Sequence, residues 1–154
     1  MNSSKHSSKH WWLSLSAVLL LAGCVSVSRV VTPLHEAVRD GQTDTATGLL
    51  QEKATDVNAQ DENGRTPLHY TATNGESGLA EMLIAAGADV NIRDDDGNTP
   101  LHLAARNSFA DIAEMLLENG ADPGVENGEG NTAFDIAEEI DSADMIDLLS
   151  RYAG

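Results

Sequence analysis

The hydrophobic residues of this chain recur with the spacing of one helix face, in segments that follow one another at a near-constant interval. Leu79, Met82 and Leu83 occupy positions i, i+3 and i+4, the pattern of an amphipathic helix. The pattern therefore predicts a series of short helices, each with one buried face. The same spacing returns in two later segments, at Ile112, Met115 and Leu116 and at Met145, Leu148 and Leu149.

A second motif stands upstream of each apolar set and predicts another helix. Thr66 can accept a hydrogen bond from the backbone at a helix start, and Pro67 suits the first helical position. Asn74 and Gly75 tolerate positive φ and are expected to end this helix. The motif occurs as Thr32-Pro33-Leu34-His35, Thr66-Pro67-Leu68-His69 and Thr99-Pro100-Leu101-His102, and in degraded form as Thr132-Ala133-Phe134-Asp135.

Two of the four units depart from this pattern. In the first unit the apolar set Ala46, Leu49 and Leu50 sits one place later, so we place the extra residue in the interhelix loop between Gly41 and Ala46. In the third unit Ser108 stands where the first two loops have glycine. A non-glycine residue in the left-handed conformation costs about 1–2 kcal/mol, so this loop is predicted to be a weak point.

Polar segments that contain glycine separate the units, over residues 56–64, 89–97 and 122–130, and they are predicted to be exposed loops. The Thr-Pro-Leu-His motif, spaced by 34, 33 and 33 residues, and the Gly-Ala-Asp sequence before the later loops resemble the ankyrin repeat. The resemblance covers residues 32–154. It implies an all-α solenoid of about four helix-turn-helix units with hairpin fingers, with repeats at about 32–61, 62–94, 95–127 and 128–154.

The first 24 residues have the order of a bacterial secretion signal. Residues 1–10 are polar and basic, and residues 11–22 are mostly apolar but too few to span a bilayer. The sequence Leu21-Ala22-Gly23-Cys24 resembles the lipobox of bacterial lipoproteins. This resemblance implies a signal peptide over 1–23, lipid on Cys24 and a short tether over 24–31. The alternative is an ordinary signal peptide with Cys24 left as a free thiol.

The lipobox also implies a location. A lipid-anchored chain stays in the bacterial cell envelope, and Val25 rather than aspartate after the cysteine implies the outer membrane, facing the periplasm. The short tether keeps the repeats near the membrane, so a partner is expected there too.

Composition and charge exclude several classes of partner and of metal or catalytic site. The chain has 9 basic and 25 acidic residues, a net charge of −16, which argues against nucleic acid as a partner. A single cysteine excludes an internal disulfide and the common zinc-finger ligand sets. The acidic loops do not fit the register of a calcium-binding EF-hand. Nucleophile and phosphate-loop motifs are absent from the sequence, so we expect no catalysis and no cofactor.

Three histidines, His35, His69 and His102, stand at one repeat position, which favours a structural role over metal binding. In ankyrin repeats this histidine bonds backbone groups and the neighbouring unit, and the resemblance implies the same bonds here.

The resemblance further implies that a protein partner binds the concave face, which is built from the fingers and the first helix of each unit. Four of the seven basic residues after Cys24 are arginines that map to this face, and arginine is enriched in binding hot spots. Phe109 is a candidate aromatic anchor. The alternatives are that this ring packs against the next repeat and that the arginines serve solubility. The candidate partner-binding residues are Arg39, Glu62, Asn63, Arg65, Arg93, Asp95, Asp96, Asn98, Arg106, Phe109, Glu129 and Asn131.

The sequence thus favours a monomeric, noncatalytic adaptor that is tethered to the envelope by lipid and binds one protein. Two finer versions stay open. One is an immunity or accessory protein for a secreted, membrane-acting toxin such as a lipase, and the other is a helper of a periplasmic antioxidant enzyme.

Overall fold

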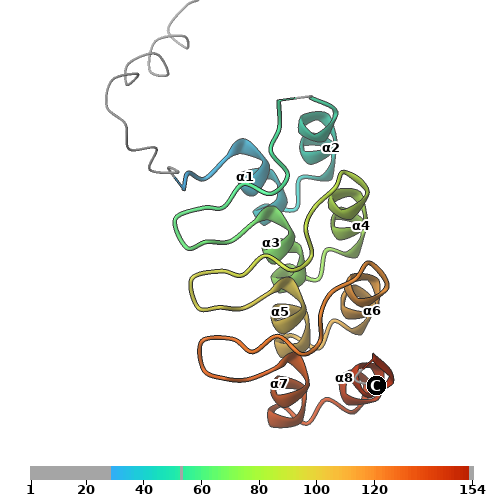
Figure 1. The fold of residues 1–154 in the computed structure, drawn as a ribbon. Helices are drawn as coiled ribbons and strands as arrows, with labels where there is room; N and C mark the ends of the chain where they lie inside the picture. Colours follow the sequence, from blue (N-terminus) through green and yellow to red (C-terminus); the bar gives the residue numbers. More distant parts are fainter. Residues whose placement is uncertain (1–28, 53, 153–154) are drawn as a thin grey trace, which may run out of the picture.

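The computed structural model describes residues 29–52 and 54–152. This part of the chain contains eight helices and no strand. No helix in it is both long enough and apolar enough to cross a bilayer. The proposed signal peptide and Cys24 lie outside the described residues. The helices are α1 (Pro33–Arg39), α2 (Thr43–Gln51), α3 (Pro67–Asn74), α4 (Ser77–Ala85), α5 (Pro100–Arg106), α6 (Ala110–Glu118), α7 (Ala133–Glu139) and α8 (Ala143–Tyr152) (Figure 1).

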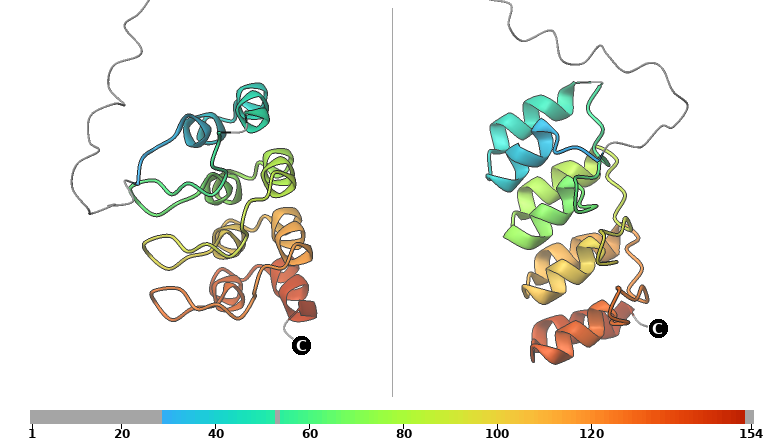
Figure 2. Two further views of the ribbon diagram at one scale, coloured as in Figure 1. Left: turned by 45° about the horizontal axis from the view of Figure 1, so that its top comes forward. Right: turned by 90° about the vertical axis from the view of Figure 1, so that its left-hand side faces the viewer.

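The helices pair in chain order, and the four pairs stack along one axis (Figures 1 and 2). The first helices of the pairs, α1, α3, α5 and α7, form an inner layer, and the second helices form an outer layer. Three loops project beyond the inner layer to one side of the stack. We call them the first, second and third fingers, over residues 56–64, 89–97 and 122–130. The predicted all-α solenoid is confirmed for this part of the chain.

Each inner helix begins at the threonine that the sequence motif predicts. All four threonines have extended backbone and take part in a capping box with the fourth residue of the motif. In the last unit Asp135 replaces histidine, and one of its carboxylate oxygens accepts hydrogen bonds from the Thr132 backbone N–H (2.7 Å) and hydroxyl (2.6 Å). The degraded fourth motif therefore starts a helix by the same kind of contact.

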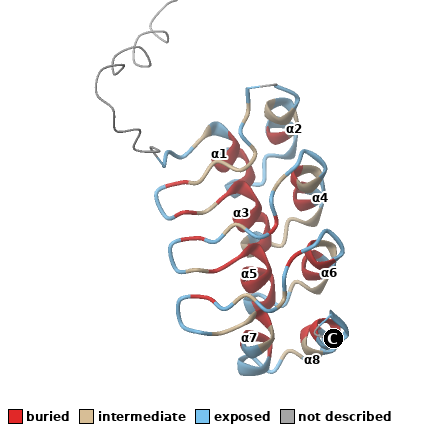
Figure 3. Cartoon of the chain, viewed as in Figure 1, coloured by how far each residue is buried: buried red, intermediate tan, exposed pale blue. Residues whose placement is uncertain are grey.

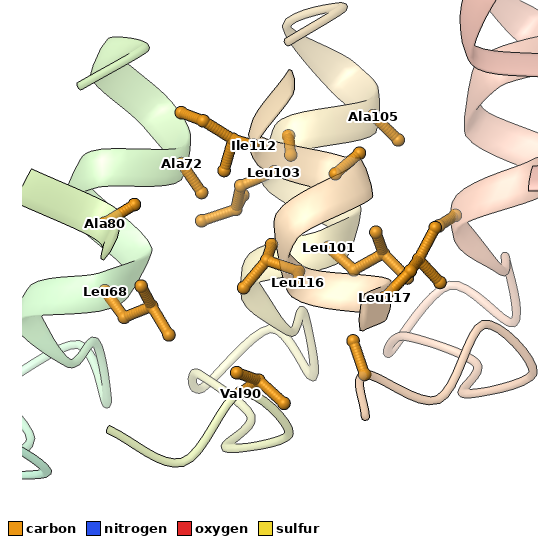
Figure 4. Packing of buried hydrophobic residues seen from close by; sticks show 14 of the residues in the cluster. Leu68, Ala72, Ala80, Val90, Leu101, Leu103, Ala105, Ile112, Leu116 and Leu117 are labelled. Atoms are coloured by element: carbon orange, nitrogen blue, oxygen red, sulfur yellow. The ribbon is translucent and has the colours of Figure 1, made fainter. Parts of the chain in front are cut away.

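The hydrophobic core is a continuous seam that runs between the two layers and from each pair to the next (Figure 3). Leu68 and Leu101 of the inner layer and Ile112 and Leu116 of the outer layer are exposed by 1% or less. Figure 4 shows these side chains meeting between neighbouring pairs rather than within one pair alone. Because each apolar face is covered partly by the adjacent repeat, stability depends on stacking.

The first unit has a different register from the one expected. Its outer helix begins at Thr43, at the same distance from the capping threonine as Ser77 in the second unit. Ala46 therefore corresponds to Ala80, and both are fully buried. The prediction that the extra residue lies in the interhelix loop is wrong, because it lies after α2, before the first finger. Periodicity misled the alignment because α4 carries two overlapping apolar sets with the same spacing, one starting at Leu79 and one at Ala80.

The interhelix loops turn through one left-handed residue each. Gly41 and Gly75 adopt φ values of 65° and 79° in the first two units, and Ser108 adopts 58° in the third. This confirms the position predicted for Ser108. Asp141, with φ of 55°, is a second non-glycine residue in this conformation, which the sequence pattern had not indicated. Both residues lie in a region that disfavours side chains with a Cβ.

We expect Ser108→Gly to stabilise the stack. Glycine removes the left-handed penalty but adds backbone entropy to the unfolded chain, so the net gain in the free energy of unfolding is about 0.5–1 kcal/mol. Urea unfolding followed by circular dichroism measures it. The matched control is Ser150→Gly, an exposed position within α8, where the same substitution should cost about 0.5 kcal/mol. A loss of stability in Ser108→Gly would contradict the prediction.

Candidate functional site

In each finger one acidic or amide side chain holds the four-residue turn that it begins, as in the turn whose Gly97 N–H donates to the Asp94 carbonyl. The Oδ1 atom of Asp94 accepts hydrogen bonds from the backbone N–H groups of Asp96 (3.1 Å) and Asn98 (2.8 Å). Asp61 and Asn127 make the equivalent bonds in the other two fingers. All three of these side chains are buried. The fingers were predicted to be exposed loops, and the prediction fails at these positions because buried backbone N–H groups need acceptors.

Backbone contacts tie neighbouring fingers together. The Asp95 N–H donates to the Asn63 carbonyl at 3.0 Å, and the Gly128 N–H donates to the Asp96 carbonyl at 2.7 Å. The Arg93 guanidinium of the second finger also donates to the Glu126 carbonyl of the third finger at 2.9 Å. Because the fingers hold one another in place, a partner that binds them has little loop ordering to overcome.

The histidines of the motif connect successive repeats, as the resemblance implied. The Nδ1 atom of His69 lies 3.0 Å from the Thr66 backbone nitrogen, and its Nε2 atom lies 3.1 Å from the Asn98 carbonyl oxygen. An N–H group must donate to Nδ1, and a carbonyl must accept from Nε2, so the ring is neutral with its proton on Nε2. His35 and His102 make the same bonds, to the carbonyls of Arg65 and Asn131.

Burial changes the pKa values of several side chains in this hydrogen-bonded framework. Desolvation lowers the pKa of His69 and of His102 below the usual value of 6.5, although both Nε2 atoms have a carbonyl partner. In the first finger, burial alone would raise the pKa of Asp61. Hydrogen bonds from the Tyr70 hydroxyl (2.5 Å) and from two backbone N–H groups outweigh burial and hold that pKa below its usual range. Burial and the same carboxylate raise the pKa of Tyr70 to about 12.

In the second and third fingers the buried side chains equivalent to Asp61 have partners other than a tyrosine hydroxyl. Among the described residues no donor forms a hydrogen bond to the Oδ2 atom of Asp94, and the Arg65 guanidinium nitrogen Nε lies 3.6 Å from it. In the third finger the amide of Asn127 instead donates to the Oδ1 atom of Asn98 at 3.0 Å. Arg65 and Asn98 occupy the same repeat position, so each is matched to the buried group of the following finger.

The structure therefore divides the candidate partner-binding residues by role. Asn98 is buried and serves the finger framework, and Arg65 and Arg93 are partly engaged by it. Arg39 is exposed and pairs with Asp40 at 3.2 Å. The remaining polar candidates are exposed or half-buried on the finger side of the stack, namely Glu62, Asn63, Asp95, Asp96, Arg106, Glu129 and Asn131.

Phe109 lies at the start of α6 and is half-buried. A Cβ atom on Gly75 would come within 2.7 Å of its ring, so the ring covers the interhelix loop of the preceding repeat. The sequence alternatives were an exposed anchor and packing against the next repeat. The contact is with the preceding repeat, which leaves only part of the ring accessible.

A hollow of about 410 Å³ brings several candidates together on the finger side. Arg106, at the end of α5, is the basic side chain in its lining, and carboxylates of the second and third fingers line the same hollow. Arg29, which the sequence had not singled out, pairs with Asp95 at the rim. The lining residues are Asp95, Asp96, Asn98, Arg106, Asn127, Gly128 and Glu129.

Among the described residues no group of three or more histidine, cysteine or carboxylate side chains could hold a metal ion. The stacked helix pairs, the linked fingers and the mixed-charge hollow define a helical-repeat protein with a rigid, extended face of the kind that binds other proteins.

Comparison with known proteins agrees with this class. A family model described as ankyrin repeats in three copies matches residues 15–94, 34–127 and 79–153. The chain therefore belongs to the ankyrin-repeat family, whose repeats are in general noncatalytic, protein-binding modules. It is also similar to cortactin-binding protein 2 of Ornithorhynchus anatinus, with 37% identity over 78 residues. That match spans 51% of this chain and 5% of the relative.

We expect the histidines to make stability depend on pH. Because folding lowers the pKa of His69 and His102, the unfolded chain takes up protons first as the pH falls below about 6.5. The free energy of unfolding should therefore fall between about pH 7 and about pH 5, above the range in which Asp61 is protonated. Urea unfolding at several pH values measures this fall.

The double variant His69→Gln/His102→Gln tests the cause. Glutamine can still complete the capping box but not the bonds to the next repeat, so the variant should lose about 1 kcal/mol per bond near neutral pH. Its stability should also fall less on acidification. Parallel pH profiles for the variant and the unmodified chain would show that these histidines are not responsible.

Proposed function

We propose that this protein is a noncatalytic, lipid-anchored adaptor of the bacterial cell envelope that binds one protein partner through its concave face. The observation that carries the proposal is the hollow between the second and third fingers, which Arg106 and several carboxylates line together on a surface that the stack itself holds rigid. An arginine in this setting can form a bidentate contact with a partner carboxylate. The neighbouring acids offer sites for basic side chains of the same partner.

The contact between Arg29 and Asp95 supports the proposal that the acids of the hollow bind basic side chains of the partner. Its guanidinium already pairs with Asp95 at the rim, which shows that a cation can reach the acidic side of the hollow. An exposed pair of this kind contributes little to stability, about 0.2–1 kcal/mol, so a basic side chain of a partner could replace it at low cost.

Lipid on Cys24 would place this surface beside the membrane. We propose the outer membrane, with the repeats in the periplasm, on the resemblance to the lipobox and on Val25 after the cysteine. The two finer versions, an immunity or accessory protein for a membrane-acting toxin such as a lipase and a helper of an antioxidant enzyme, both need a partner in this compartment. Identification of the captured protein separates them.

Arg106→Glu is expected to weaken capture of the envelope partner at least about thirtyfold, the loss typical of a hot-spot residue. Pull-down from envelope extracts, quantified by mass spectrometry, measures it. The matched control is Arg151→Glu, which makes the same change of charge at an exposed position on α8. Undiminished capture by Arg106→Glu, or equal loss in both variants, would rule out the hollow as the binding site.

The anchor is tested separately. Cells grown with a labelled acyl-chain analogue should incorporate it into the protein, and Cys24→Ala should abolish incorporation because the thiol is the expected attachment point. Ser26→Ala serves as the control and should be labelled normally. Unlabelled protein released into the medium would contradict lipid anchoring while leaving the binding face untouched.

A further inference from the structure

The outer layer of helices contains a second hollow, away from the fingers. It has a volume of about 550 Å³ and lies between α4 and α6. This volume is within the range of about 300–1,000 Å³ that is common for binding sites. The residues that line it are Glu81, Ile84, Ala85, Asp111, Glu114, Met115, Glu118 and Asn119.

The lining combines apolar and acidic side chains. Ile84 of α4 and Met115 of α6 are half-buried, although both pack against the core, so part of each side chain remains accessible from the hollow. Glu81, Glu114 and Glu118 also line the hollow and are exposed. The described residues that line the hollow include no basic side chain that would neutralise these carboxylates.

The spacing of the lining residues gives the hollow a direction. On α6 the lining residues are at positions i, i+3, i+4 and i+7, beginning at Asp111, and on α4 they are at i, i+3 and i+4, beginning at Glu81. These are the rows from which helices build the grooves that accept another helix. The groove therefore extends over about two helical turns between two neighbouring helices.

The charge of the outer helices determines which classes of partner the groove attracts or repels. The helices α2, α4, α6 and α8 carry seven carboxylates and one arginine, Arg151 at the far end of α8. The surface therefore repels a second copy of this acidic chain, nucleic acid and anionic lipid, and it attracts basic segments.

We propose that the groove between α4 and α6 is a second docking site, which takes a basic amphipathic helix from another protein. Apolar side chains of that helix contact Ile84 and Met115, and flanking lysine or arginine residues pair with the glutamates of the lining. This mode of recognition lays the apolar face of a helix into a groove. The site is independent of the concave face, so both can be occupied at once.

A synthetic peptide tests the proposal directly. The probe is a fluorescent helical peptide of about 14 residues, roughly four turns, with a leucine stripe flanked by lysines. Fluorescence anisotropy should show saturable binding to the full chain. Glu114→Lys/Glu118→Lys should weaken binding at least tenfold, and Met115→Gln, which keeps the side-chain size, should weaken it severalfold. Thermal unfolding checks that each variant remains folded.

Two controls separate the groove from general attraction to an acidic protein. Asp144→Lys/Asp147→Lys makes the same change of net charge on α8 and should alter binding less than twofold. A peptide of the same composition with its leucine stripe scrambled should bind at least tenfold more weakly. Equal loss in the two double variants, or equal binding of the scrambled peptide, would overturn the proposal.

One further variant distinguishes peptide binding in the groove between α4 and α6 from binding at the concave face. Arg106→Glu should leave peptide binding unchanged, whereas the envelope partner proposed above depends on this arginine. Loss of peptide binding in Arg106→Glu would assign the peptide to the fingers and overturn the second site. Self-association of the chain through α4 and α6, seen by analytical ultracentrifugation and abolished by Glu114→Lys/Glu118→Lys, would also overturn it, because the occupant would then be a second copy.

Discussion

The hydrogen bond from each motif histidine to the carbonyl just before the capping threonine of the next inner helix is the constraint on which the rest of the molecule depends. It joins the start of one inner helix to the base of the following finger, as His69 does with the Asn98 carbonyl. The same residue's N–H donates to the Asp94 side chain. Rotation of one repeat against the next would break the bond from the histidine, so the fingers stay parallel and the hollow between them keeps its shape.

Much of the polar sequence in the fingers serves this framework before it serves any partner. Asp61, Asp94 and Asn127 accept backbone bonds in the interior, and Arg65 and Arg93 are drawn toward the next finger. Polar groups that are removed from water need such partners, which explains why residues that look like surface chemistry are structural here. Arg106 and the carboxylates that line the same hollow form the part of the surface that is left to recognise another protein.

Most of the fold could be predicted from the sequence because ankyrin repeats are built by local rules applied at a constant period. The capping threonines, the left-handed turn at Ser108 and the all-α stack follow from short-range preferences and from the need of each apolar face for a neighbour. The register of α2 did not follow. Two overlapping apolar sets satisfy the helical period equally well, and only packing against α4 distinguishes them.

The sequence by itself determined the repeat, the starts of the four inner helices and the residue types on the finger side, because these depend on contacts within a few turns of chain. Tertiary structure alone decided which of these side chains are available. Asn98 is buried by a bond to Asn127 in the next finger, and Phe109 is covered by packing on Gly75 of the preceding repeat. The groove between α4 and α6 arises in the same way, since its walls come from residues about 30 positions apart that only stacking brings face to face.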